Sequence, residues 1–188
     1  MAMPKYLFLI ISSLLLYSCN TQNNKKAIRQ IDELQHKTDS LLNIVENINK
    51  DTLEYMYQTT SDKLNFFKNL NTLLSNNAHQ NIVAAWGYDF KFFKKQKQKP
   101  AKFYYQLNFS KKQLNDLKED IENGVLSADK IHQYTNDEIK AWETTKMEVN
   151  SFFTALKKEK QKFYFLLPQI NQIIDSIQQQ PAIKKQVK

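Results

Sequence analysis

The sequence predicts an all-α protein, and two observations carry this prediction. The 188 residues include two glycines and four prolines, which are too few for the frequent turns of a β protein. Apolar residues also recur every three or four positions over long stretches, as they do along one face of an amphipathic helix. The chain length is that of one domain, so we expect a single helical domain over residues 27–179.

The first apolar stripe predicts a helical arm over residues 27–75. It consists of Ala27, Ile31, Leu34, Leu41, Val45, Ile48 and Tyr55, with Thr38 and Thr52 in its two gaps. A stripe this narrow is typical of a coiled-coil seam. A capping box formed by Asp51 and Glu54 predicts a helix break over 49–51, and we expect a second break over 59–61.

The last apolar stripe predicts a second arm over residues 128–179. Ser127 is a suitable N-cap, and Leu126 and Ile131 have the spacing of a hydrophobic staple. The stripe consists of Ile139, Trp142, Lys146, Val149, Phe153, Leu156, Lys160, Phe163, Leu167, Ile170, Ile174 and Ile177. Pro168 lies within it, so we expect a kink or a new helix start there.

Residues 78–126, between the two arms, are predicted to form a small helical head. Within residues 81–109, aromatic positions fit a helix better, although alternating Phe and Tyr residues leave a β-hairpin as the alternative. A clear helix is expected to start at Ser110, which forms a capping box with Gln113. Gly124 is the expected left-handed residue that ends this helix.

The two arms have similar lengths, which favours an elongated antiparallel helical hairpin or coiled coil with the head at its far tip. Each arm would span roughly 75 Å if its helix were continuous. A compact helical bundle, with helix breaks at 49–51 and Pro168, is the alternative architecture. The polar residues 180–188 are expected to form a flexible tail.

The amino terminus has the pattern of a secretory signal peptide. One lysine precedes an apolar run over residues 6–16, which is about a dozen residues and too short for a membrane span of roughly 20. The segment resembles the signal of bacterial lipoproteins, since Leu16, Ser18 and Cys19 match the lipid-attachment motif of that class and Tyr17 departs from it. The composition of the chain is similar to that of Bacteroidota proteins.

This resemblance implies that residues 1–18 are removed, that Cys19 carries the lipid, and that residues 19–26 form a lipidated linker. Because Asn20 is not the aspartate that retains such proteins at the inner membrane of enteric bacteria, we expect an outer-membrane anchor. The linker has no acidic patch, which favours the periplasmic face. An uncleaved membrane anchor, or a cleaved signal in which Cys19 is incidental, are the alternatives.

The chain has a formal net charge of +8, which suits an anionic partner. The expected location in the cell envelope argues against nucleic acid as this anionic partner. Six lysines interleaved with aromatic residues are the candidate contacts for an anionic partner: Lys91, Lys94, Lys95, Lys97, Lys99 and Lys102. The alternative is that the aromatic rings fill a small core and the lysines are a solvated surface.

No catalytic or metal-binding pattern emerges from the sequence. The three histidines, His36, His79 and His132, have no metal-ligand spacing, and the single cysteine rules out an intramolecular disulfide. We therefore expect no enzyme activity, no metal and no cofactor. The favoured function is that of a scaffold, adaptor or interaction module with a protein partner or self-association, and the alternatives are a protective inhibitor or immunity-type lipoprotein, or a carrier of lipid or another small ligand.

Overall fold

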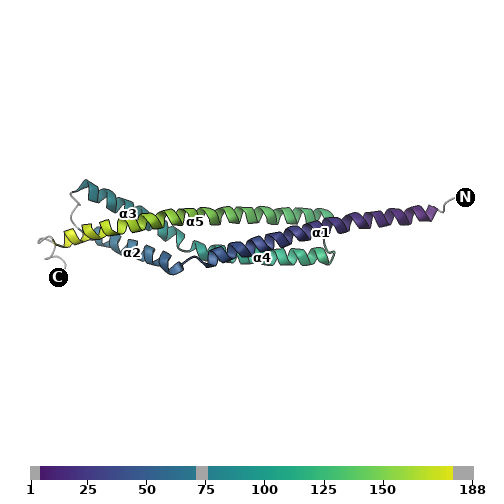
Figure 1. The fold of residues 1–188 in the computed structure, drawn as a ribbon, viewed down its shortest axis with the longest axis horizontal. Coiled ribbons are helices and arrows are strands. Elements are labelled where there is room, and N and C mark those ends of the chain that lie inside the picture. The colour runs from purple at the N-terminus through teal and green to yellow at the C-terminus, as the bar shows by residue number, and fades with distance from the viewer. Residues whose placement is uncertain (1–4, 71–75, 180–188) are drawn as a thin grey trace. The chain divides into compact units, whose positions relative to one another are not determined.

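The computed structural model describes the backbone of residues 5–70 and 76–179, and the side chains of this part except those of residues 5–21 and 23. It contains five helices and, within the described residues, no strand, so the predicted all-α class is confirmed. The helices are labelled in Figure 1. They are α1 (Lys5–Glu46), α2 (Lys50–Lys68), α3 (Asn77–Gln96), α4 (Lys99–Glu122) and α5 (Ala128–Gln178).

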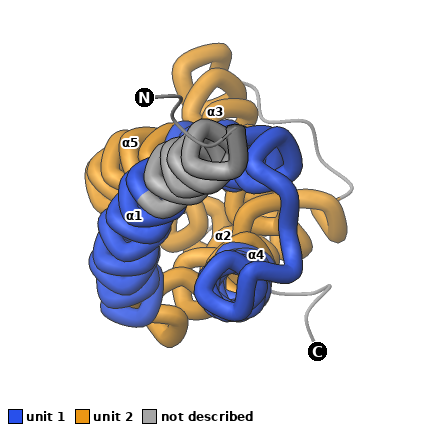
Figure 2. The backbone as a smooth tube through the Cα atoms, turned by 90° about the vertical axis from the view of Figure 1, so that its right-hand side faces the viewer, with its two compact units in different colours: residues 1–47, 102–148 blue, residues 48–101, 149–188 orange. Residues whose placement is uncertain are grey.

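The chain divides into two compact units, which Figure 2 shows in different colours. Unit 1 comprises residues 1–47 and 102–148, so it contains α1, nearly all of α4 and the first part of α5. Unit 2 comprises residues 48–101 and 149–188, so it contains α2, α3 and the second part of α5. Each unit therefore combines three helical segments from separate parts of the sequence.

In unit 1, α1 is antiparallel to α4 and parallel to α5. Lys118 and Lys111 of α4 pair with Asp32 and Asp39 of α1, each at 2.7 Å, so the α4 numbers fall as the α1 numbers rise. Lys37 of α1 lies over the Trp142 ring of α5 at 5.7 Å, whereas Ala27 and Ile131 line one hollow near the start of α5. The α5 numbers therefore rise with those of α1.

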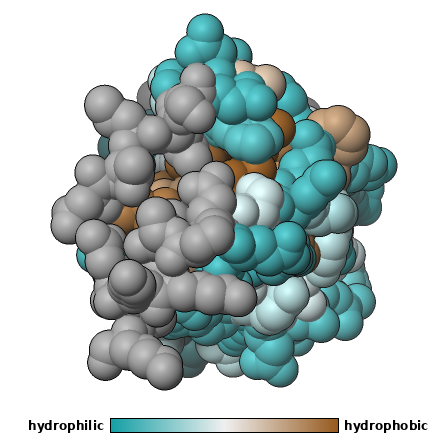
Figure 3. Space-filling view, turned by 90° about the vertical axis from the view of Figure 1, so that its left-hand side faces the viewer, coloured by the Kyte–Doolittle hydropathy of each residue, from teal (hydrophilic) through white to brown (hydrophobic). Residues whose placement is uncertain are grey.

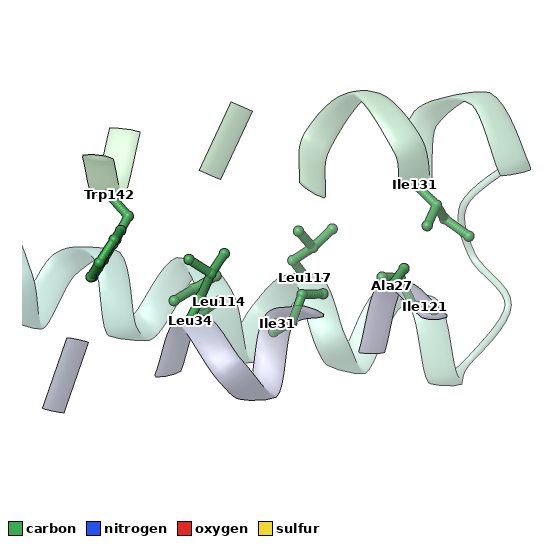
Figure 4. Close-up of a cluster of buried hydrophobic side chains, with 8 residues drawn as sticks. All are labelled: Ala27, Ile31, Leu34, Leu114, Leu117, Ile121, Ile131 and Trp142. Carbon is green, nitrogen blue, oxygen red and sulfur yellow. The ribbon is translucent and has the colours of Figure 1, made fainter. Parts of the chain in front are cut away.

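Eight buried apolar side chains from these helices form a core cluster in unit 1, which Figure 4 shows in close-up. They are Ala27, Ile31 and Leu34 of α1, Leu114, Leu117 and Ile121 of α4, and Ile131 and Trp142 of α5. Successive members differ by three or four residues along α1 and α4 and by eleven, about three helical turns, along α5, so one stripe of each helix is buried. Burial of apolar surface stabilises a fold by about 25 cal/mol per Å², so this cluster contributes to the stability of unit 1.

In unit 2, α2 is antiparallel to α3 and parallel to α5. The Tyr57 and Phe90 rings of α2 and α3 are stacked with centroids 5.8 Å apart, and Lys97, just after α3, pairs with Glu54 of α2 at 3.5 Å. The α3 numbers therefore rise as the α2 numbers fall. Tyr55 contacts Phe163 of α5 edge to face at 6.1 Å, and eight residues further along α2, Lys63 bonds Asn171 at 2.6 Å. The same eight-residue step separates Phe163 from Asn171, so α2 and α5 run in one direction.

The predicted antiparallel pairing of the arms at 27–75 and 128–179 is therefore wrong in both units. The residues that were assigned to a head, 78–126, contain two helices of 20 and 24 residues. These are long enough to run back along α2 and α1 as their antiparallel partners. The third helix of each unit then has the direction of the first, and each unit is a three-helix bundle.

The predicted break between α1 and α2 is confirmed, but its cap differs from the predicted one. The N-cap of α2 is Asn49, whose side chain accepts a hydrogen bond from the Thr52 backbone N–H at 2.7 Å. The second predicted break, over 59–61, is wrong, because α2 continues to Lys68. Thr60 is buried within it and donates its hydroxyl to the Met56 carbonyl at 2.9 Å, which satisfies this polar group inside the helix.

Residues 81–96 and 99–109 are helical, which excludes the β-hairpin alternative. The predicted start at Ser110 is wrong, because α4 begins at Lys99 and Ser110 lies in its interior. Pro100 is accommodated in the first turn, where its missing N–H would have no helical acceptor. The predicted left-handed residue is confirmed, since Gly124 has a φ of +67°.

Helix α5 is continuous from Ala128 to Gln178. Ser127 precedes it as predicted, and the Ile131 N–H donates to the Ser127 carbonyl at 2.9 Å. No new helix starts at Pro168, because buried residues on both sides, Leu166 and Ile170, hold the helix in place. The end of the first arm at residue 75 and the tail at 180–188 lie outside the described residues.

Candidate functional site

Cys19, the candidate lipidation site, is one of the residues of α1. Its side chain is outside the described part of the chain, and so are the side chains of the rest of the predicted signal peptide. Helix α1 also includes the residues that were assigned to the linker, 19–26. A search of the described residues finds no helix that is long and apolar enough to cross a membrane. Lipidation of Cys19 stays a prediction.

The six candidate lysines do not lie on one surface. Lys91, Lys94 and Lys95 are exposed on α3, where successive residues are rotated by about 100° around the helix axis. Lys91 lies 5.6 Å from the centre of the Tyr88 ring, and Lys94 lies 5.9 Å from that of Phe90. Because Phe90 stacks on Tyr57 of α2, Lys94 is on the α2 side of the helix.

Lys97 also belongs to the α2 side, since its Nζ atom lies 3.8 Å from the centre of the Tyr57 ring and 3.5 Å from Glu54 Oε2. Lys99 is the first residue of α4, and Lys102 belongs to unit 1. The structure therefore separates the lysine run into an α2 side and an outer side, and the role of these lysines in binding stays a prediction.

Unit 2 contains a buried ionic group that the sequence did not predict. Asp89 of α3 has no exposed surface, and its Oδ1 atom accepts a short hydrogen bond from Lys162 Nζ of α5. Glu159 Oε2 is 3.7 Å from the same ammonium group. The other Asp89 oxygen, Oδ2, is buried and has no hydrogen-bond partner within the described residues. An aspartate thus takes a core position between α3 and α5.

Three aromatic rings pack together at positions close to Asp89 in α3 and to Lys162 in α5. Trp86 and Phe163 are stacked with centroids 5.2 Å apart, and Phe93 meets Phe163 edge to face at 5.9 Å. All three side chains are completely buried. Burial among these rings raises the pKa of Asp89 from 3.8 to about 6; Lys162 opposes this rise and Glu159 adds to it.

The environment of Asp89 indicates a structural role. A general acid or base must come within hydrogen-bond reach of its substrate, and Asp89 has no surface open to one. A polar side chain at a buried coiled-coil position instead specifies the register of the helices. We infer that the bond to Lys162 fixes the register of α3 against α5.

Helical spacing was the signal that could have located Asp89. The helical spacing of Ile82, Trp86, Phe90 and Phe93 predicts that these four residues share one face of a helix. The buried set is Trp86, Asp89 and Phe93, at steps of three and four, while Phe90 is half-buried against α2. A strict seven-residue count would have placed the aspartate in the core.

A second missed feature is an acidic hollow of about 320 Å³ between α4 and α5 of unit 1. Four carboxylate side chains line it: Asp116, Asp120, Asp137 and Glu138. Burial and the adjacent Asp137 raise the pKa of Glu138, whose Oε2 atom is buried with no hydrogen-bond partner in the described part. Among the described residues, no group of three acidic, histidine or cysteine side chains is arranged to hold a metal ion.

The comparisons with known proteins identify no relative. No protein-family model, no curated protein and no solved structure matches the chain. The function must therefore be argued from the residues of this chain and their arrangement.

Proposed function

We propose that this protein is a lipid-anchored protein of the bacterial envelope that acts by contact, as a scaffold, adaptor or interaction module. The observation that carries the proposal is the apolar run over residues 6–16, which ends in Leu16 and is followed closely by Ser18 and Cys19. Several acyl chains on one cysteine would anchor the protein stably, since each buried methylene contributes about 0.8 kcal/mol. An outer-membrane anchor with the helical units in the periplasm fits the residues that follow Cys19.

Exposed aromatic side chains on α4 support action by contact. Tyr105 and Phe109 are 72% and 63% exposed, and they lie four residues apart on one face of the helix. Aromatic side chains are enriched where proteins bind one another, because they bury a large area with few rotatable bonds. This face suits a protein partner better than it suits solvent.

The carrier alternative has less support. A hollow of about 300 Å³ between α1 and α5 of unit 1 is lined mainly by polar side chains, among them Lys26, Gln30 and His132. Pockets for apolar ligands are lined mostly by apolar and aromatic groups. The inhibitor or immunity-type alternative shares the anchor and differs in its partner, which would be one soluble protein in a fixed stoichiometry.

Metabolic labelling with an alkyne fatty acid tests the anchor. We expect the wild-type chain and Ser18→Ala to incorporate the label, because alanine keeps the small residue before Cys19. Cys19→Ser should lose the label and leave the membrane fraction. Label that persists in Cys19→Ser would refute the anchor.

Site-specific photo-crosslinking tests action by contact. A photoreactive residue in place of Phe109 should capture an envelope protein, whereas the same residue in place of Asn43, an exposed polar position of α1, should not. Capture of one soluble protein in equal amount would favour the inhibitor class. Equal, non-specific capture from both positions would contradict the proposal.

A further inference from the structure

The two units differ strongly in charge. The sequence of unit 2 contains 15 lysines and six acidic residues, whereas that of unit 1 contains 12 basic and 13 acidic residues. The excess positive charge of the chain therefore belongs to unit 2. An anionic surface would attract this unit, and the attraction would weaken with added salt.

One side of unit 2 combines exposed lysines with exposed aromatic rings. The Asp89–Lys162 bond fixes α3 beside α5, Tyr88 is adjacent to Asp89, and Phe165 follows Lys162 by one helical turn. Tyr88 and Phe165 are 67% and 70% exposed. Lys91 and Lys95 follow Tyr88 by three and seven residues along α3, and Lys158 precedes Phe165 by seven along α5, so each set lies on one side of its helix. We name the set of Tyr88, Lys91, Lys95, Lys158 and Phe165 the α3–α5 face.

The lysines of the α3–α5 face are available to a ligand. Lys95 and Lys158 are exposed, and neither makes an ion pair within the described residues. Lys91 is also exposed and lies over the Tyr88 ring, which places its ammonium group beside that exposed aromatic side chain. On the side of the molecule that Figure 3 shows, most of the described residues are hydrophilic, with apolar areas between them.

We propose that the α3–α5 face docks on the surface of a membrane that contains anionic phospholipids. Lysine ammonium groups attract the phosphates of such a surface, and each contributes roughly fivefold to the affinity. Amphipathic rings such as that of Tyr88 suit the headgroup layer, and the Phe165 ring suits the boundary with the acyl chains. The lysines and the exposed rings of this face therefore suit the headgroup layer of the membrane and its boundary with the acyl chains.

This inference rests on the proposed function, because a lipid on Cys19 would keep unit 2 within reach of a membrane. The two can still fail separately. Docking is measured on residues 19–188 with Cys19→Ser, which carry no lipid, whereas the anchor is measured by acyl labelling of cells. A failure of vesicle docking would leave the lipid anchor standing, and a failure of acyl labelling would leave the docking standing.

Vesicle binding tests the lysines. The chain should bind vesicles of phosphatidylglycerol and phosphatidylcholine, and bind phosphatidylcholine vesicles weakly. The triple variant Lys91→Gln, Lys95→Gln and Lys158→Gln should lose about 100-fold in affinity for the mixed vesicles. The matched control is Lys112→Gln, Lys130→Gln and Lys140→Gln, three exposed lysines of unit 1, which removes the same charge and should lose less than about threefold.

Tryptophan fluorescence tests where the membrane touches the protein. The native Trp86 and Trp142 are 0% and 8% exposed, so their emission should not respond to vesicles. Phe165→Trp should shift its emission to the blue on addition of the mixed vesicles, and Phe109→Trp of unit 1 should not. Circular dichroism confirms that each variant keeps its helices.

Three outcomes would overturn the docking proposal. One is the absence of binding to the mixed vesicles by the parent chain. Another is an equal loss in the two lysine variants, which would indicate attraction by net charge alone. The third is a blue shift at Phe109→Trp and none at Phe165→Trp. If the chain does not bind vesicles and captures an acidic envelope protein, the partner of this face is a protein and not a membrane.

Discussion

Asp89 shows how one residue determines local structure and pH response in unit 2. Its carboxyl group is completely buried among Trp86, Phe93 and Phe163, and Lys162 supplies its counter-charge. Burial of a charged group is costly, so the pKa of Asp89 is raised to about 6. The folded protein therefore holds a proton on Asp89 at pH values where the unfolded chain has released it.

The sign of the resulting pH effect follows from proton binding. Between pH 3.8 and about 6 the folded state binds more protons at Asp89 than the unfolded state does, so this residue lowers the free energy of unfolding as the pH rises. We expect Asp89→Asn to remove this contribution, which is on the order of 3 kcal/mol across the interval. Urea unfolding of parent and variant between pH 4 and 7 measures the difference.

A matched control for this prediction is Asp62→Asn, which changes an exposed aspartate of the same unit. It should leave the pH dependence of the parent nearly unchanged. Parallel curves for the parent and Asp89→Asn over the whole interval would contradict the raised pKa.

The Asp89 position also shows what the sequence could reveal of the candidate sites. The predicted lipid-attachment motif at Cys19 is local, so adjacent residues are enough to propose it. The Asp89–Lys162 pair joins residues 73 positions apart, and no local pattern relates them. The lysine run was visible in the sequence, but its division into two sides depends on the helical phase of α3 and on the position of Tyr57 in α2.

Helix ends are where single residues decide the course of the chain. The end of α4 is a Schellman motif, in which the Val125 N–H donates to the Asp120 carbonyl at 3.0 Å and the Gly124 N–H donates to the Ile121 carbonyl at 3.1 Å. This geometry requires the φ of +67° at Gly124. It reverses the chain toward α5 within a few residues.

The two glycines should respond oppositely to substitution by alanine. Gly124→Ala should cost about 1 kcal/mol of stability, entirely from backbone strain, because no atom lies within 4 Å of the added Cβ. Gly87→Ala should stabilise by about 0.5–1 kcal/mol, because Gly87 is inside α3 and the nearest atom to its added Cβ, Leu64 Cδ2, is at 3.9 Å. Urea denaturation measures the stability of both variants. Effects of the same sign would contradict a left-handed Gly124 together with a helical Gly87.

At the scale of the whole molecule, the direction of the helices is the main result. In each unit a returning helix, α3 or α4, is antiparallel to the helix from the first arm, and α5 is parallel to that helix. The helix directions are established by ion pairs, a hydrogen bond and contacts of aromatic rings. They connect residues that an antiparallel pairing of the arms would hold far apart.

Thiol cross-linking tests the direction of α2 against α5. In a Cys19→Ser background, Lys63→Cys with Asn171→Cys should be joined by a short bis-maleimide, because the native side chains are 2.6 Å apart. The control pair is Lys63→Cys with Ala155→Cys of the same unit, which a reversed α2 would bring together about the Tyr55–Phe163 contact. Residues 155 and 171 are roughly 24 Å apart along α5, so the control pair should stay unlinked. Efficient linkage of the control pair alone would contradict the parallel arrangement.

The sequence by itself determined the all-α class, the break before Asn49, the turn at Gly124 and the start of α5 after Ser127, because each depends on residues close together in the chain. The tertiary structure decided which helices pair, in which direction, and that Asp89 is buried against Lys162. The physical reason is that an apolar stripe specifies which face of a helix is buried. The same stripe can pack against a parallel or an antiparallel neighbour.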